Sequence, residues 1–86
     1  MMTFNYSELI LRRSYPYGTA TLPTEDERNQ LLIDLRGALT DGDWFTAKLM
    51  RLIFKSDRIN KARLARVYPK EVYAVWIYEK GGIDES

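Results

Sequence analysis

A chain of 86 residues that is 45% hydrophobic and 13% aromatic has room for one small core and is too apolar to be intrinsically disordered. It contains neither cysteine nor histidine, which excludes disulfide bonds, thiolate–zinc sites and imidazole metal ligands. Residues 1–11 do not fit a secretory signal, because Asn5, Ser7 and Glu8 interrupt their apolar residues, and no apolar run approaches the roughly 20 residues that a bilayer requires. We therefore expect a single soluble domain spanning residues 1–86, located in the cytoplasm, with no cofactor, no metal and no membrane contact.

The net charge of +1 conceals an uneven distribution along the chain. Residues 44–70 carry eight cations and one acid, Asp57, whereas residues 1–43 and residues 71–86 each carry a net charge of −3. An uneven distribution of this kind gives information about the charge of a binding partner and not about the fold.

Residues 1–22 show no clear pattern, and we expect an irregular N-terminal arm with one or two helical turns. Ser7 can cap a short helix that ends at Arg13, but residues 4–11 also suit an extended edge segment. Residues 15–18, Tyr-Pro-Tyr-Gly, indicate a turn, because proline fixes φ and glycine permits a positive φ.

The first clear helix is expected over residues 25–39. Thr24 and Glu27 have the spacing of a capping box, and three acids in the first turn suit the positive end of the helix dipole. Its apolar residues fall on one stripe: Leu31, Leu32, Leu35, Ala38 and Leu39. We read the following Asp41-Gly42-Asp43 as a turn and a cap, because the ligand series of a calcium loop is missing.

Two further helices are expected over residues 44–55 and 58–67. Asp43 is the predicted cap of the first, and either Ser56 or Asp57 caps the second. The helix over 44–55 is so apolar that we expect it to be the central one, packed on more than one side.

The last helix is expected over residues 69–80. Pro69 favours a helix start, and Lys80 with Gly81 favours an end, although the sequence VYAVWIY between them has the composition of a strand. Residues 82–86 are expected to form a frayed tail. The predicted fold class is all-α: a small bundle of three to four helices, about 25–39, 44–55, 58–67 and 69–80, with an irregular N-terminal arm.

Two groups of side chains are candidates for a binding site. The candidate basic surface consists of Lys48, Arg51, Lys55, Arg58, Lys61, Arg63, Arg66 and Lys70. It suits phosphate contacts with DNA or RNA, an acidic protein partner, or simply a solvated face. Residues 44–67 fit a helix-turn-helix poorly, since the connector Lys55-Ser56-Asp57 has no glycine. The candidate aromatic interface consists of Tyr73, Trp76 and Tyr78, which could equally pack in the core.

A sparse pattern of residues runs through the second half of the chain. It consists of Asp57, Asn60, Arg63 and Leu64, followed by Tyr68, Pro69, Glu71, Val72 and Trp76. Over residues 49–81 this pattern resembles that of small, uncharacterised bacterial and prophage-type helical proteins. The resemblance implies a phage or mobile-element origin and brings no activity with it.

The residues also bear on the class of function. There is no nucleophile–histidine pair and no phosphate-binding glycine loop, so we expect the protein not to be an enzyme. We expect a binding or assembly module that acts through protein–protein contacts, with a protein partner or with a second copy of the chain, as in a homodimer. DNA or RNA binding through residues 48–70 is the alternative.

Overall fold

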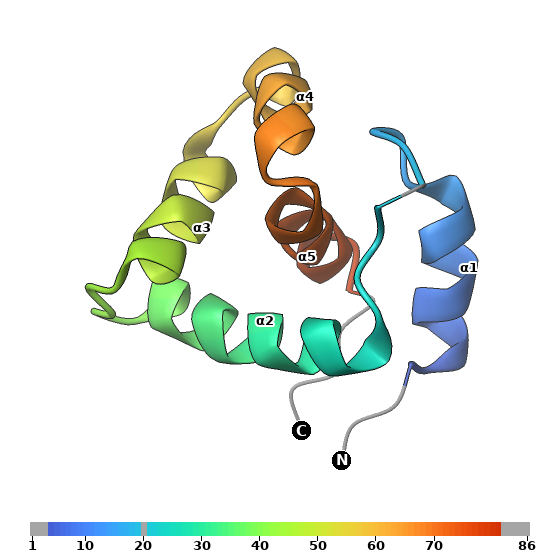
Figure 1. Cartoon of the computed structure of the whole chain (residues 1–86), viewed down its shortest axis with the longest axis horizontal. Coiled ribbons are helices and arrows are strands. Elements are labelled where there is room, and N and C mark those ends of the chain that lie inside the picture. Colours follow the sequence, from blue (N-terminus) through green and yellow to red (C-terminus); the bar gives the residue numbers. More distant parts are fainter. Residues whose placement is uncertain (1–3, 20, 82–86) are drawn as a thin grey trace.

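The computed structural model describes residues 4–19 and 21–81, and these form five α-helices and no strand. The helices are α1 (Tyr6–Ser14), α2 (Glu25–Leu39), α3 (Phe45–Lys55), α4 (Arg58–Val67) and α5 (Pro69–Glu79) (Figure 1). The all-α class is confirmed, and the four expected helices lie where they were predicted. The predicted frayed tail at residues 82–86 lies outside the described residues.

Local chemistry fixes most helix ends as expected. The Glu27 amide donates to Thr24 Oγ1 at 3.2 Å and the Thr24 amide donates to Glu27 Oε1 at 2.9 Å, which completes the capping box. Asp57, rather than Ser56, caps α4 by accepting from the Asn60 amide at 2.8 Å. The predicted Asp43 cap is wrong: the N-cap of α3 is Trp44, whose side chain makes no capping hydrogen bond.

Helix α1 takes the place of the irregular arm that was expected from the sequence. Its N-cap is Asn5, not Ser7, and the Asn5 side chain accepts from the Glu8 amide at 2.7 Å. Asparagine followed three residues later by glutamate is a recognised signature of a helix start, so the signal was present but was not used. Figure 1 shows α1 standing beside α5, and the two helices are in contact.

The central helix is α5, and the prediction that residues 44–55 are central is wrong. Helix α5 contacts each of the other four helices and lies between them in Figure 1. Its run of Val72, Tyr73, Ala74 and Val75 is completely buried, as is Ile77. A helix that is apolar all round belongs in the middle of a bundle, and this accounts for the strand-like composition of α5. Helix α3 instead leaves Phe45 and Leu52 exposed.

None of the helices in residues 4–19 and 21–81 has the length and hydropathy needed to cross a membrane.

Candidate functional site

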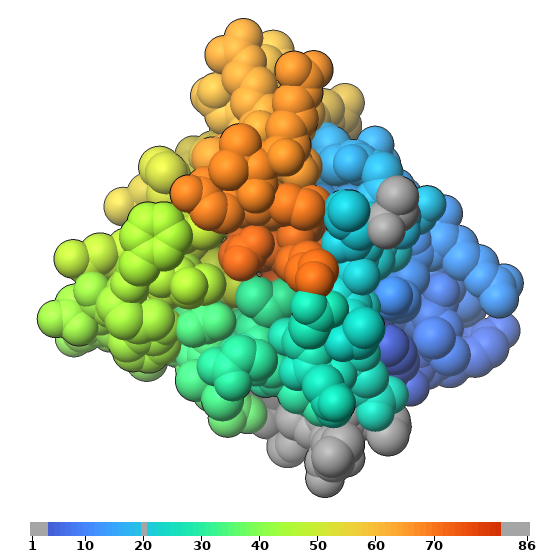
Figure 2. Space-filling view, viewed as in Figure 1, coloured from blue at the N-terminus to red at the C-terminus, as the bar shows by residue number. Residues whose placement is uncertain are grey.

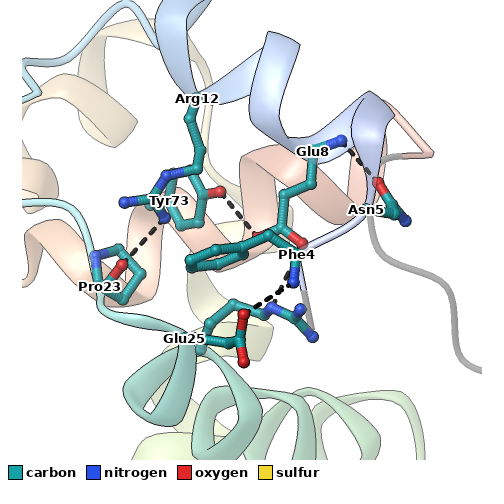
Figure 3. A network of polar contacts seen from close by, with 8 residues as sticks. Phe4, Asn5, Glu8, Arg12, Pro23, Glu25 and Tyr73 are labelled. Carbon is teal, nitrogen blue, oxygen red and sulfur yellow. Dashed lines mark hydrogen bonds and ion pairs between the residues drawn. The ribbon is translucent and has the colours of Figure 1, made fainter. Parts of the chain in front are cut away.

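A buried polar network joins α1 to α2 and α5. Glu8 and Arg28 are the two buried charged residues in the described part of the chain. The Tyr73 hydroxyl donates to Glu8 Oε2 at 3.0 Å, and Arg28 Nε lies 3.3 Å from Glu8 Oε1 as an ion pair. Figure 3 shows Glu8 and Arg12 pointing from α1 toward Tyr73, with Phe4 alongside. The guanidinium groups of Arg12 and Arg28 lie 4.4 and 5.1 Å from the centre of the Phe4 ring.

The electrostatics of this network follow from its burial. Desolvation raises the pKa of Glu8 above its ordinary value of 4.5, although the Tyr73 hydroxyl and the Arg28 charge act in the opposite direction. Burial, with the Glu8 charge, also raises the pKa of Tyr73 well above 10. Perturbed groups often mark active sites, but only where a substrate can reach them. Glu8, Arg28 and Tyr73 are enclosed by the core, so we interpret the network as a structural connection.

In the structure, three cations of the candidate basic surface bind other described groups of the chain, and five do not. Arg51 donates to the backbone carbonyls of Gly37, Ala38, Thr40 and Gly42 at 2.9–3.2 Å, and so caps the end of α2. Lys61 pairs with Glu79 at 2.9 Å, and Lys70 pairs with Glu27. The other five are exposed and make no ion pair with a described residue: Lys48, Lys55, Arg58, Arg63 and Arg66. The assignment of Arg51 to a free basic surface is therefore corrected, because its guanidinium holds the corner between α2 and α3.

The candidate aromatic interface does not form one surface. Tyr73 is completely buried and faces Glu8, so its place at an interface is corrected to a place in the core. Tyr78 packs edge-on against Phe54 with ring centres 5.8 Å apart. Trp76 packs edge-on against Tyr15 at 5.5 Å. Trp76 and Tyr78 are half-buried, and each has a different neighbour.

Exposed apolar side chains lie on α3 and at the end of α4. Phe45, Leu52 and Val67 are 66%, 55% and 69% exposed. The Phe45 ring lies 6.1 Å from the ring of Tyr68, the residue that follows Val67 and joins α4 to α5. We call Phe45, Leu52, Val67 and Tyr68 the α3–α4 apolar surface. In Figure 2 the yellow-green atoms of α3 adjoin the orange atoms at the end of α4 on the viewed face.

Cations are interleaved with this apolar surface. Phe45, Lys48, Leu52 and Lys55 follow one another at intervals of three and four residues, so they share one side of α3. On α4, Arg63 lies one turn before Val67. All three cations are exposed, and an apolar surface is thereby bordered by positive charge.

This surface was missed from the sequence because the apolar residues of α3 were assigned to the core. The available signal was the breadth of its apolar side: Phe45 and Leu52 lie on a different side of the helix from Met50 and Ile53, and one helix buries only one stripe unless it is central.

Comparison with protein-family models, curated proteins and solved structures gave no match for this chain. The phage or mobile-element origin therefore stays a prediction, and a function can be proposed only from the side chains themselves.

Proposed function

We propose that the protein is a non-enzymatic, cytoplasmic binding module that docks an acidic protein partner on the α3–α4 apolar surface. One observation carries the proposal: Phe45 and Leu52 on α3 and Val67 at the end of α4 are each more than half exposed, with exposed cations one turn away on the same helices. Exposed apolar patches larger than a few hundred Å² are rare on monomers and commonly mark interaction sites.

The chemistry of the surface specifies the partner. Phe45, Leu52 and Val67 offer contacts to apolar residues spaced along one side of a helix, which is the common way in which an amphipathic helix is recognised. Lys48, Lys55 and Arg63 would then face acidic residues at the edges of that helix and exclude basic ones. An acidic amphipathic helix therefore satisfies both parts of the surface.

Selection from a random library of helical peptides tests the proposal, with the immobilised protein as the bait. We expect enrichment of acidic peptides with apolar residues at intervals of three and four. Leu52→Asp should weaken binding of the selected peptides by about tenfold or more, because it places a charge in the centre of the contact.

Ile33→Asp is the matched control, since Ile33 is 51% exposed on α2 and the change in charge is the same. Both variants should melt like the wild type. Peptides that bind the two variants equally, or that carry no acidic residues, would contradict the proposal. If the wild type forms a dimer that Leu52→Asp dissociates, the protein partner is a second copy of the chain.

Nucleic-acid binding is the second candidate, favoured by the five exposed cations without a described ion-pair partner. The connector Lys55-Ser56-Asp57 between α3 and α4 has no glycine, which argues against a helix-turn-helix. Contacts would be with phosphates, and affinity for DNA should fall steeply with salt. Arg63→Glu combined with Arg66→Glu should abolish a gel shift seen at low salt, and no shift at low salt would contradict this candidate.

A further inference from the structure

A cleft of about 660 Å³ lies where the loop after α1, the start of α4 and the end of α5 meet. Two aromatic residues line it, Tyr17 and Trp76, together with three cations, Arg58, Lys61 and Lys80, and one acid, Glu79. The volume is in the range of about 300–1,000 Å³ that small-molecule sites occupy. None of these residues belongs to the α3–α4 apolar surface.

The aromatic walls of this cleft are held in place before any ligand arrives. Tyr15 is only 5% exposed and makes edge-on contacts with both rings, at 5.5 Å to Tyr17 and 5.5 Å to Trp76. A third edge-on contact, to Tyr73, anchors Tyr15 in the core. Edge-to-face packing restrains ring orientation. A flat ligand can therefore stack on Tyr17 or Trp76 without ordering either ring first.

The charges around these rings favour an anion. Arg58 is exposed and makes no ion pair with a described residue. Lys80 Nζ lies 5.8 Å from the centre of the Trp76 ring, and Lys61 is held by Glu79 at 2.9 Å. Arg58 and Lys80 are thus the cations that remain for a ligand. Glu79 can also accept a hydrogen bond from a hydroxyl or amino group.

We propose that this cleft binds a nucleotide, with the base stacked on Trp76 or Tyr17 and a phosphate held by Arg58 and Lys80. A simple inorganic anion would make no use of the two rings, and a neutral apolar ligand would make no use of the cations. Aromatic platforms flanked by cations are the usual arrangement for unpaired nucleotides. The nucleotide is either free or part of a single strand, because duplex DNA does not present its base faces.

Tryptophan fluorescence tests this proposal. Trp44→Phe leaves Trp76 as the sole tryptophan, and circular dichroism verifies that the variant is folded. We expect thymidine monophosphate or a thymidine octanucleotide to quench Trp76, and inorganic phosphate to leave it unchanged. Binding of both to a similar extent identifies a free nucleotide, and a clear preference for the octanucleotide identifies single-stranded nucleic acid. The wild type gives a second readout, since one of its two indole N–H signals should shift in NMR spectra.

Two double substitutions that remove the same charge distinguish binding in the cleft from nonspecific attraction of an anion to the cations of the protein. Arg58→Ala with Lys80→Ala should weaken binding about tenfold, since two phosphate contacts are lost. Arg13→Ala with Arg36→Ala removes the same charge from exposed positions on α1 and α2, outside the cleft, and should leave the affinity unchanged. Equal weakening by the two pairs, or no quenching and no indole shift with either nucleotide form, would overturn the proposal.

Discussion

Gly37 is the residue on which the corner between α2 and α3 depends. A Cβ atom at this position would lie 2.3 Å from the Trp44 ring, and one at Gly42 would lie 2.7 Å from the same ring. The ring is also held by a hydrogen bond, because its indole N–H donates to Asp34 at 2.8 Å. Both glycines are therefore required by close packing around one indole.

We expect Gly37→Ala to lower the free energy of unfolding by about 1–3 kcal/mol, the usual effect of overpacking. Alanine has a helix propensity about 1 kcal/mol better than glycine, but the clash with Trp44 outweighs that gain. Urea unfolding measures the difference. In a Trp44→Leu background the clash is absent, so the same substitution should become neutral or stabilising. An undiminished stability of Gly37→Ala in the wild-type background would show that the ring is free to move.

Glu8 makes stability depend on pH. Because its pKa is raised in the folded protein, the folded state binds this proton more tightly than the unfolded chain does. Its contribution to stability is therefore complete below pH 4.5 and is lost as the pH rises through the raised pKa. Relative to Glu8→Gln, which stays neutral, the wild type should lose about 1.4 kcal/mol for each unit by which the pKa is raised. Urea unfolding across this range measures the loss.

Glu27 is a control for Glu8, because its pKa is shifted in the opposite direction and stability should depend on pH in the opposite sense. The hydrogen bond from Lys70, aided by the Thr24 amide, lowers the pKa of Glu27 to about 2. Its contribution is present above pH 4.5 and is lost as the pH falls toward 2. Glu27→Gln should therefore change the pH dependence only on the acidic side. A stability difference between the wild type and Glu8→Gln that is constant with pH would mean that Glu8 titrates alike in both states.

At the scale of helices, a helix end could be predicted from the sequence where all the residues that determine it lie within one turn. The Thr24–Glu27 capping box, Pro69 at the start of α5 and Gly81 with φ of 75° after its end are all local features. The Asn5 cap of α1 is of the same kind. It was missed because Ser7 offered a competing cap and residues 4–11 also suited an extended segment.

Which helix is central could not be read from local pattern. Helices α3 and α5 are both strongly apolar, and their order of burial depends on α1, which covers α5 through contacts distant in sequence. The Tyr73–Glu8 hydrogen bond spans 65 residues and the Lys70–Glu27 pair spans 43. The candidate basic surface was misjudged for the same reason: the carbonyl partners of Arg51 lie 9 to 14 residues away, where no periodicity points to them.

At the scale of the whole molecule, α1 is part of the core rather than an arm laid over it. It supplies the buried Glu8, and the chain that follows it supplies the buried Tyr15. Arg12 extends the connection by donating to the Pro23 carbonyl at 2.9 Å. A core of this size usually contributes only about 3–5 kcal/mol, so the molecule has little stability to lose.

Removal of residues 1–22 should therefore abolish cooperative unfolding, because the α5 surface around Tyr73 would become exposed and Arg28 would lose its partner Glu8. Circular dichroism melting curves measure the loss. Tyr6→Ser is the control, since Tyr6 is 79% exposed on α1 and should melt like the wild type. A peptide of residues 1–22 added to the truncated chain should restore helicity, because the surface that it covers is left intact. A truncated chain that melts at the wild-type temperature would return residues 1–22 to the role of an arm and leave α2 to α5 as the complete folding unit.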